Sequence, residues 1–436
     1  MRRAYNFNDK AIGALDATEL QGETMISQHD RSVLRDLATQ YKELCDSERN
    51  QQAIARWRNL NNLKSDRPLV YCNTGLLGGE IRPHLPQCRV EDRELGHVEG
   101  WLLSQLWHAA RGDDRVFYPW FQARAELFCH PEGVWGIAPD RMRDAQSRGW
   151  RNMPVLKKME DLDRLKATEH RVIDPDPPLA RKLRDIFGGI LPVHVKRSTV
   201  YPVWGGTDLS EAPGTLFGLE ELMYAIYDAP EMVHRFMTFT RDAVLENLKQ
   251  GEAAGDWSTA DSWYYLTPPH CDELPDPAPN SHGARLKDLA YFSHAQEFEA
   301  VSPAQHQAFL LDYQMPVMEL FGKITYGCCD TLDTKLEILR KIPNLAKIVS
   351  GPLSDPACYP EGFGDDCVIS WRPLGSIIAT GRFDEDLQRK QIRDGLEKLR
   401  GCQVEVHMHE PMTVQGDVSR ISRWAQIARE EAERAV

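Results

Sequence analysis

Segments that read as strands alternate with segments that read as helices throughout the C-terminal half of the chain. The apolar runs at 323–328, 345–352 and 403–410 have the length and the flanking turn residues of buried strands. Residues 384–401 and 417–435 instead place apolar side chains at helical spacing. Because this alternation is typical of a sheet covered by helices, it predicts the α/β class with a mostly parallel sheet.

The number of strand–helix pairs favours a closed barrel. Further strand-like runs stand at 67–73, 115–121, 191–195, 199–204, 257–263 and 367–373. Enough pairs follow Arg67 to complete a (β/α)₈ TIM barrel, which needs roughly 250 residues or more. An open doubly wound sheet has the same rhythm, but no GxGxxG or GxxxxGK[ST] motif follows an early strand. We therefore expect a single barrel over 67–436. Residues 30–62 read as helix, so 1–66 are expected to form an N-terminal helical extension.

Composition limits which kinds of partner and which cellular compartment we expect for the protein. The formal net charge of −13 over 436 residues argues against nucleic acid as the main partner, because phosphate binding needs a basic face. No apolar run approaches the roughly 20 residues that span a bilayer, and the basic N-terminus lacks the apolar core of a secretion signal. We therefore expect a cytoplasmic protein. In that reducing compartment the ten cysteines stay free, which favours metal binding or catalysis over disulfides as their special role.

The ends of the predicted strands gather the residues that can do chemistry. In a (β/α)₈ barrel the active site lies at the C-terminal ends of the strands. That rule places near one mouth Asp261, Trp263, Tyr326, Cys328, Cys329, Ser350, Arg372, His407, His409 and Glu410. The candidate catalytic side chains are Asp261, Tyr326, Arg372 and Glu410. A guanidinium such as that of Arg372 suits an anionic group on the ligand.

Two short motifs indicate a metal site. In HMH, His407 and His409 lie on the same side of an extended strand, since strand side chains alternate with period two. The GCC turn presents Cys328 and Cys329 just past a neighbouring strand. Zinc takes Cys and His ligands and, when catalytic, keeps one position open for substrate. These four residues are therefore the candidate Zn²⁺ ligands, although their spacing is not that of a CxxC…CxxC site.

Each of these patterns also has a purely structural interpretation. Adjacent cysteines after a glycine can simply pack a tight turn, and a buried HMH can be two hydrogen-bonded core imidazoles. Asp261 can be the N-cap of the next helix. Arg372 can belong to an ordinary ion pair, and the aromatic side chains around Trp263 can be barrel packing.

A long segment rich in Pro, Asp and Gly, residues 267–288, interrupts the alternation of strand-like and helix-like segments. Loops of this length inside a compact domain are usually lids, binding loops or disordered insertions. The segment follows an aromatic DSWYY run, which is what a pocket for a flat organic ligand needs. The candidate cofactor-binding residues are Trp263, Tyr264, His270 and Ser350.

Three stretches of the sequence resemble one superfamily. APEMVHRFM (229–237), ADSW (260–263) and ITYGCCDTLDTKLEILRKIPNLAKIVSGPLSD (324–355) resemble the uroporphyrinogen decarboxylase-like superfamily. More closely, they look like its YGCC-containing branch, which is grouped with cobalamin-dependent methyltransferases. The resemblance is strongest over 218–433 and looser over 67–205. It implies a (β/α)₈ barrel with the ligand in the C-terminal mouth.

The resemblance implies methyl transfer more than decarboxylation. The decarboxylases of the superfamily bind an acidic tetrapyrrole through an RQAGRY-type segment, whereas residues 69–80 read LVYCNTGLLGGE. The methyltransferase members hold zinc through a His-x-Cys pair and a last-strand cysteine. Cys328 or Cys329 would match the first cysteine, but Tyr326 and Gly327 stand where the histidine would precede it. The nearest substitutes for the last-strand ligand are the two histidines of HMH.

The leading hypothesis is therefore zinc-assisted methyl transfer between a small methylated or thiol substrate and cobalamin or another corrinoid, carried by a partner corrinoid protein. Zinc would activate a thiol or polarise the heteroatom that carries the methyl group. Asp261 would orient substrate or move a proton, and Glu410 would support a ligating histidine. The alternatives are a metal-free decarboxylase or lyase of a small acidic metabolite, and a non-catalytic ligand-binding subunit. Homodimer formation is left open.

Overall fold

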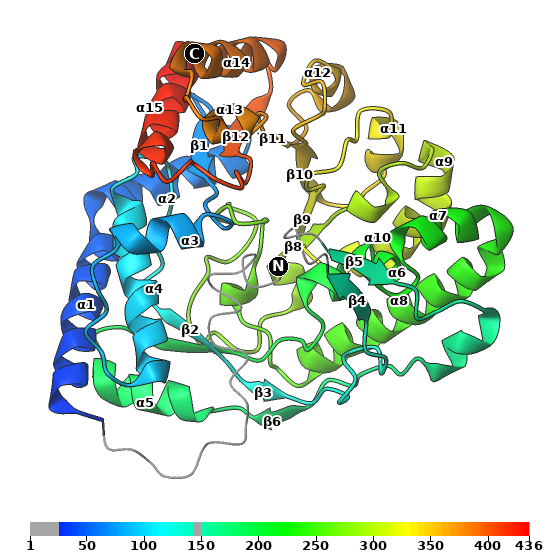
Figure 1. The fold of residues 1–436 in the computed structure, drawn as a ribbon, viewed down its shortest axis with the longest axis horizontal. Coiled ribbons are helices and arrows are strands. Elements are labelled where there is room, and N and C mark those ends of the chain that lie inside the picture. The colour runs from blue at the N-terminus through cyan, green and yellow to red at the C-terminus, as the bar shows by residue number, and fades with distance from the viewer. Residues whose placement is uncertain (1–25, 144–149, 436) are drawn as a thin grey trace.

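The computed structural model describes residues 26–143 and 150–435. The first 25 residues of the predicted extension lie outside the described residues. The longer strands lie inside the molecule with helices around them, whereas a few short strands lie toward its edges (Figure 1). The helices are α1 (Gln28–Asp46), α2 (Glu48–Asn61), α3 (Gly78–Ile81), α4 (Arg93–Ala109), α5 (Pro178–Phe187), α6 (Glu211–Leu216), α7 (Leu219–Asp228), α8 (Pro230–Ala253), α9 (Pro303–His306), α10 (Asp312–Met318), α11 (Leu336–Leu339), α12 (Cys358–Phe363), α13 (Ser376–Ala379), α14 (Glu385–Lys398) and α15 (Ser419–Arg434).

Six parallel strands form the main sheet, in the order β1-β12-β11-β10-β9-β8. They are β1 (Leu69–Cys72), β8 (Ala290–Ser293), β9 (Lys323–Tyr326), β10 (Leu345–Ser350), β11 (Val368–Trp371) and β12 (Gln403–Met408). A separate parallel pair joins β2 (Phe121–Arg124) to β7 (Val193–Lys196). Two antiparallel pairs join β3 (Glu126–Leu127) to β6 (Val172–Asp174) and β4 (Asp140–Arg143) to β5 (Trp150–Met153). The predicted parallel α/β architecture is confirmed.

Side-chain hydrogen bonds act at two of the edges where backbone ladders stop. On the β1 side, the Asp114 carboxylate accepts the Val70 N–H at 3.0 Å. On the β7 side, Asn280 accepts the Val195 N–H at 3.0 Å. Among the described residues, the hydrogen-bonded strands do not close into a ring, which differs from the closed eight-stranded barrel expected from the sequence. The reason is local: the segments that would complete the ladder use polar side chains as backbone partners.

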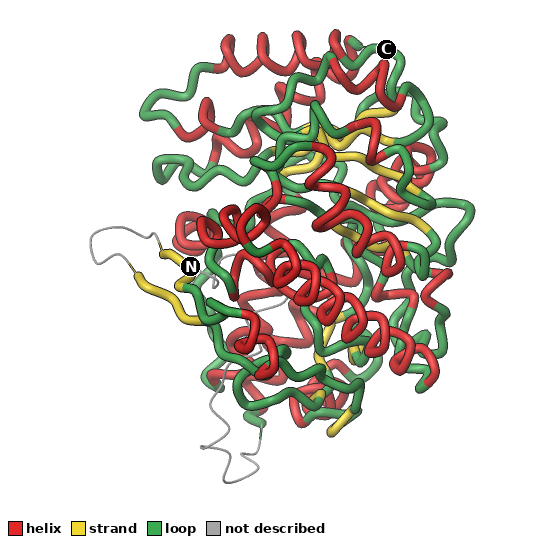
Figure 2. Tube along the Cα trace, turned by 90° about the vertical axis from the view of Figure 1, so that its right-hand side faces the viewer, coloured by secondary structure: helices red, strands yellow, loops and turns green. Residues whose placement is uncertain are grey.

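Two apolar cores hold the helices to the strands. The larger lies between the main sheet and its covering helices, with Phe236, Val317, Ile348, Ile369, Ile392 and Trp424 among its buried members. The second joins α1, α4 and α5 to the β2–β7 pair, with Leu34, Leu102, Leu183 and Val193 buried in it. A view from the side shows the long helices flanking the strands (Figure 2). No helix within the described part of the chain has both the length and the apolarity that crossing a bilayer requires.

Residues 30–62 form two helices, where the sequence pattern predicts one helical segment. Ser47 ends α1 and begins α2. Its N–H donates to the Leu44 carbonyl at 3.2 Å, and its hydroxyl accepts the Asn50 N–H at 3.3 Å. A short hydroxyl side chain satisfies the free backbone groups at both helix ends, so the chain can turn there without loss of hydrogen bonds.

Three predicted strands are wrong. In the 115–121 run, residues 115–120 form no strand, and β2 begins only at Phe121. In the 199–204 run, residues Val203–Thr207 form a π-helical turn. In the 257–263 run, residues Thr259–Asp261 form a 3₁₀ turn. There the Asp261 carboxylate accepts the Ser258 N–H at 3.0 Å, which is a capping interaction. Ser, Thr and Asp side chains offer the backbone local partners, and these compete with strand pairing.

Candidate active site

The C-terminal ends of β1, β9, β11 and β12 bring reactive side chains together. β9 is followed by the GCC turn, β11 by Arg372, β12 by His409, and β1 by Asn73. Hydrogen-bonding, ring or charge interactions connect these groups. We call them the thiol site, which consists of Asn73, Cys328, Cys329, Arg372, His407, His409 and Glu410. The strand-end rule therefore groups correctly the two motifs that the sequence analysis singled out.

Gly327 makes the turn that presents the two thiols. Its φ of +99° lies in the left-handed region that favours glycine. A Cβ atom there would lie 2.8 Å from Leu332 Cδ1 and 3.0 Å from Val349 Cβ. After this turn the Cys328 N–H donates to the Asp330 carboxylate at 2.6 Å. The glycine of GCC is thus required by both backbone conformation and space.

Replacing Gly327 by alanine is expected to lower the free energy of unfolding by about 2 kcal/mol or more, because the strained backbone and the close contacts add. Urea unfolding followed by circular dichroism measures the change. The matched control is Gly79→Ala in α3, where an added Cβ would meet no heavy atom within 4 Å. Equal stability of the two variants would contradict the assigned role of Gly327.

The two thiols differ in their protonation. Their sulfur atoms are 3.5 Å apart, and Cys328 Sγ is 3.6 Å from the Tyr265 hydroxyl. Burial raises the pKa of Cys328 well above its ordinary value. The hydrogen bond from Cys328, with smaller contributions from His409 and Arg372, lowers the pKa of Cys329 to about 4 against burial. Cys329 is therefore the thiolate of the pair at neutral pH, and it is the half-buried, more accessible one.

Arg372 is buried against the thiols and an aromatic ring. Arg372 is only 2% exposed. The guanidinium carbon lies 4.2 Å from the centre of the Tyr265 ring, and Nη1 donates to Cys328 Sγ at 3.8 Å. The arrangement stacks a cation on an aromatic face and holds it beside sulfur, where it favours the thiolate form.

His407 and Glu410 complete the floor of the site. His407 packs edge-on against Tyr71, with ring centres 5.1 Å apart. Burial, with a smaller contribution from Arg372, lowers its pKa well below the ordinary value, so the imidazole is neutral. Glu410 accepts a hydrogen bond from Asn73 at 2.6 Å, and burial raises its pKa. His407 therefore adds no positive charge beside the Arg372 guanidinium, and burial shifts the pKa of Glu410 toward its protonated form.

The predicted zinc ligands do not form a metal site in this arrangement. Among residues 26–143 and 150–435, no three His, Cys, Asp or Glu side chains are grouped as metal ligands. The Arg372 guanidinium also stands beside Cys328, and its charge opposes a cation there. The four residues share a site, but in this arrangement their donor atoms do not converge as a set of three ligands.

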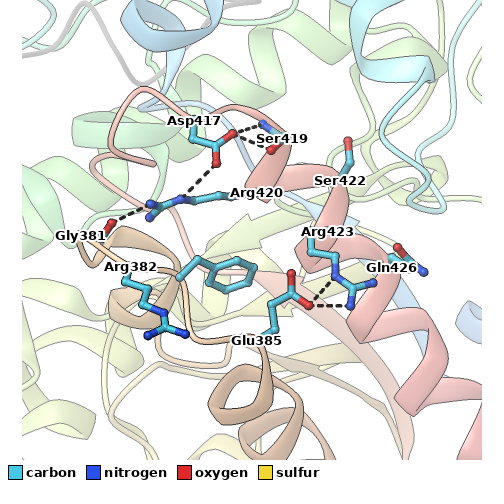
Figure 3. A pocket seen from close by; sticks show the side chains of 10 residues that line it. Gly381, Arg382, Glu385, Asp417, Ser419, Arg420, Ser422, Arg423 and Gln426 are labelled. Atoms are coloured by element: carbon cyan, nitrogen blue, oxygen red, sulfur yellow. Dashed lines mark hydrogen bonds and ion pairs between the residues drawn. The ribbon is translucent and has the colours of Figure 1, made fainter.

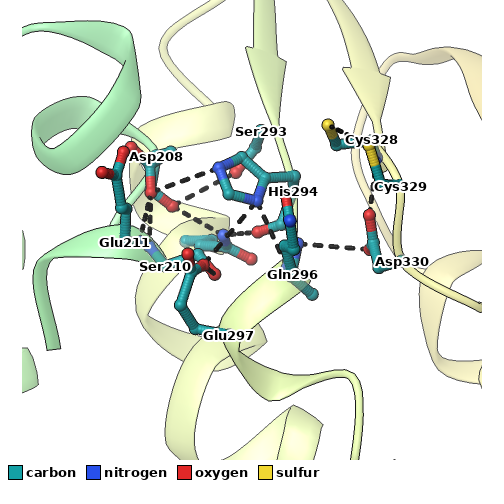
Figure 4. Close-up of polar contacts among 12 residues, drawn as sticks. Asp208, Ser210, Glu211, Ser293, His294, Gln296, Glu297, Cys328, Cys329 and Asp330 are labelled. Carbon is teal, nitrogen blue, oxygen red and sulfur yellow. Dashed lines mark hydrogen bonds and ion pairs between the residues drawn. The ribbon is translucent and has the colours of Figure 1, made fainter. Parts of the chain in front are cut away.

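A second polar cluster lies beside the thiol site, around His294 (Figure 4). His294 follows β8. Its Nε2 is 3.6 Å from Asp208 Oδ1, and its Nδ1 is 4.0 Å from Glu297 Oε2. Burial lowers the pKa of His294, but the two carboxylates outweigh it and raise the pKa. Burial raises the pKa of Glu297 to about 7. Both shifts favour the protonated form of the group concerned.

Asp330 connects the two clusters. Its carboxylate accepts the Cys328 N–H at 2.6 Å and the Ala295 N–H at 3.3 Å, so it fixes both strand ends (Figure 4). The sequence analysis did not single out His294, because the AYFS strand is only four residues long and directly follows the irregular segment. The available signal was a histidine at the end of a short apolar run, the same pattern that found His409.

Glu297→Gln is expected to become more stabilising as pH rises. A carboxyl whose pKa is raised on folding contributes its full stability below its ordinary pKa of about 4.3 and loses it as pH rises through the folded value. The free energy of unfolding of the variant relative to wild type should therefore increase between about pH 5 and about pH 8. Urea titrations at both pH values test this, with exposed Glu337→Gln as control. A pH-independent difference would contradict the assignment.

Three predicted site residues lie on the side of the scaffold near β7 and the 267–288 segment. Asp261 is 3.7 Å from His194 and 3.9 Å from Lys196, as well as capping its own turn. His270 bonds Asp276 at 2.7 Å. Trp263 packs on Phe292, with ring centres 5.9 Å apart. Of these, only Trp263 adjoins the aromatic group next to the thiols.

The remaining predicted residues face other partners. The Tyr326 hydroxyl bonds His306 at 2.8 Å and Gln314 at 2.9 Å, on the helix-covered side of β9. The Ser350 side chain is buried and interacts with Tyr359 of α12. The Tyr264 ring lies 5.1 Å from Lys347 Nζ. The structure does not bring Tyr326, Ser350 or Tyr264 into contact with the thiols.

The aromatic wall of the thiol site combines Tyr265, from the aromatic run that the sequence analysis pointed to, with Phe292 and Trp204, which it did not select. Tyr265 packs on Phe292 with ring centres 4.6 Å apart, and Trp204 packs on Tyr265 at 5.6 Å and on His294 at 4.8 Å. Tyr265 adopts φ of 43°, and Trp204 sits in the π-helical turn. Periodicity cannot place residues that belong to such irregular backbone.

A solvent-accessible cavity of about 650 Å³ lies elsewhere, between α15 and the segment before α14 (Figure 3). Arg382, Arg420 and Arg423 line it. Arg420 pairs with Asp417, and Arg423 pairs with Glu385. Because two of the three guanidinium groups already have carboxylate partners, the cavity has little free positive charge for a ligand.

Comparison with known proteins finds similarity among solved structures alone. No protein-family model and no curated protein matches the sequence. Among solved structures, a methyltransferase from Methanosarcina mazei is similar over 87% of this chain and 98% of that chain, with 10% sequence identity and a TM-score of 0.47. A similarity at this level carries no argument about activity, which has to come from the geometry of the thiol site.

Proposed function

We propose that the protein is a methyltransferase in which the Cys329 thiolate receives the methyl group. The observation that carries this proposal is the environment of Cys329, whose pKa falls to about 4 beside Cys328, His409 and Arg372. A thiolate is the nucleophilic form of cysteine, and a thiol with this pKa is ionised at neutral pH. Its half-buried position leaves access for a small electrophile.

The proposed transfer has two steps. In the first, a lone pair on Cys329 Sγ forms an S–CH₃ bond, while the bond from the methyl carbon to the donor atom breaks and its electron pair stays on the donor. In the second, an acceptor nucleophile takes the methyl group, and the electron pair of the S–CH₃ bond returns to sulfur. Arg372 and His409 stabilise the thiolate before the first step and after the second.

The proposed acceptor is a reduced corrinoid carried by a partner protein. Three large apolar side chains are exposed in the loops after β10, β11 and β12: Leu353 (73% exposed), Leu374 (40%) and Met412 (54%). The loops after β11 and β12 leave strand ends that carry the thiol site, and β10 lies between β9 and β11 in the same sheet. An apolar rim around a reactive centre suits the docking of a protein that delivers its cofactor to that centre.

The proposed fold arranges its strands as a (β/α)₈ barrel does, even though the hydrogen bonds between strands do not close into a ring. The main sheet and the β2–β7 pair are both parallel, and side chains such as Asp114 and Asn280 supply backbone hydrogen bonds at their edges. This arrangement would place the strand ends in one mouth, as in a (β/α)₈ barrel.

Transfer of a labelled methyl group tests the proposal. The full chain is incubated with a deuterated-methyl corrinoid, which runs the second step in reverse, and its cysteine peptides are examined by mass spectrometry. We expect one labelled methyl group on Cys329 and none on the exposed Cys88. Labelling spread over several cysteines, or absent from Cys329, would refute the proposed role of Cys329.

One observation favours a second candidate, a metal-free lyase acting on a small acid. Glu297, with its pKa of about 7, and His294 form an acid–base pair that methyl transfer does not need. In a lyase these groups would move the proton, and Cys329→Ser would keep its activity. Screening small carboxylic acids for carbon dioxide release with Cys329→Ser and His294→Gln separates the two functions.

A further inference from the structure

Arg372 has an unused pair of hydrogen-bond donors inside the thiol site. Nη1 points at Cys328 Sγ, but buried Nε and Nη2 have no hydrogen-bond partner among the described residues. Nε and Nη2 lie on one edge of the planar guanidinium, with parallel N–H bonds. Buried donors without partners are rare in native proteins, and each demands an explanation such as a ligand.

Neighbouring side chains do not satisfy this edge. The Cys329 thiolate is a nearby negative charge. However, the hydrogen bond from Arg372 to sulfur is made by Nη1, to Cys328, and so does not involve Nε or Nη2. Glu410 is held by Asn73, at 2.6 Å, and forms no ion pair with Arg372 in the described structure. The edge without a partner, formed by Nε and Nη2, is one that can donate to both oxygens of a carboxylate at once.

We propose that the open edge of Arg372 binds the carboxylate of a small substrate, so that the methyl-bearing atom of a methylated carboxylic acid is held at Cys329. This inference rests on the proposed function only in taking Cys329 as the reacting atom. The two parallel donors match the two oxygens of a carboxylate, and the Tyr265, Phe292 and Trp204 rings provide an apolar wall for the carbon skeleton.

The charge of the site selects a monoanion. Arg372 is the buried cation of the thiol site, and His407 beside it is neutral because burial depresses its pKa. The Cys329 thiolate already places one negative charge beside this single guanidinium. A dianionic phosphate would therefore meet too little positive charge, whereas one carboxylate adds one negative charge and two charge-assisted hydrogen bonds.

Two alkylating reagents of nearly equal size test the proposal without any methyl donor. Iodoacetate carries a carboxylate next to its reactive carbon, and iodoacetamide carries a neutral amide. The rate of modification of each cysteine in the full chain is measured by peptide mass spectrometry, with exposed Cys88 as the internal reference. We expect the iodoacetate-to-iodoacetamide rate ratio at Cys329 to exceed that at Cys88 by about tenfold or more, and acetate to protect Cys329 better than acetamide does.

Variants identify the group responsible. Arg372→Lys keeps the charge but loses the two-donor edge, so the ratio at Cys329 should fall toward that at Cys88. Arg382→Lys, in the cavity beside α15 and outside the thiol site, should keep the wild-type ratio. Equal ratios at Cys329 and Cys88 in the wild-type protein would overturn the proposal, and so would failure of Cys329 to react with either reagent, since a substrate could not then reach Arg372. Loss of methyl transfer with the ratio intact would refute the proposed function alone.

Discussion

Replacing Cys329 by serine is expected to lower the rate of methyl transfer by about a thousandfold or more. A serine hydroxyl stays protonated at neutral pH, so the variant lacks the nucleophile that Arg372 and His409 stabilise in the wild-type protein. The measurement is the initial rate of labelled-methyl uptake from the corrinoid. Retention of the wild-type rate would move the reacting atom away from Cys329.

Two further variants show whether the effect is specific to this thiolate. Cys328→Ser should reduce the rate much less, because a serine hydroxyl in that place can still donate the hydrogen bond that contributes most to the low pKa of Cys329. Cys88→Ser removes an exposed thiol and should leave the rate unchanged. Equal losses in Cys328→Ser and Cys329→Ser would indicate that the two sulfurs act as one unit.

The sequence was sufficient to predict the parallel sheet and the position of the thiol site. Strand periodicity and strand-end position are local properties, so they correctly joined the GCC turn with the HMH strand, although these motifs lie some eighty residues apart. The same reasoning could not show which side of a strand end each residue faces. Tyr326 and Ser350 are the last residues of their strands, and their side chains point to the face that the helices cover. There Tyr326 contacts Gln314, and Ser350 contacts Tyr359.

Residues outside regular elements could not be predicted. Asp208 follows a π-helical turn, and Tyr265 takes a left-handed backbone conformation, so neither obeys a period that a sequence reveals. Their importance depends on partners that are distant in the chain: Asp208 meets His294, and Tyr265 meets Arg372. Likewise, the unmatched donors of Arg372 become visible only once all of its neighbours are in place.

Replacing Lys347 by methionine is expected to lower the free energy of unfolding by about 3–5 kcal/mol. Lys347 and Glu405 form an ion pair of 2.5 Å between β10 and β12, and both side chains are at most 2% exposed. Ser370, on the strand between them, donates to the other carboxylate oxygen at 2.6 Å. Without the lysine, Glu405 would keep its burial but lose its charged partner, which is the costly situation.

The double variant Lys347→Met/Glu405→Leu distinguishes the pair from either residue alone. Removing both charges leaves no buried ion unpaired, so the double variant should be more stable than Lys347→Met, even though it carries one more substitution. Urea unfolding of wild type, both single variants and the double variant gives the coupling energy. If the losses of the single variants simply add, Lys347 and Glu405 do not compensate each other, and the stability of the sheet below the thiol site must come from its apolar packing.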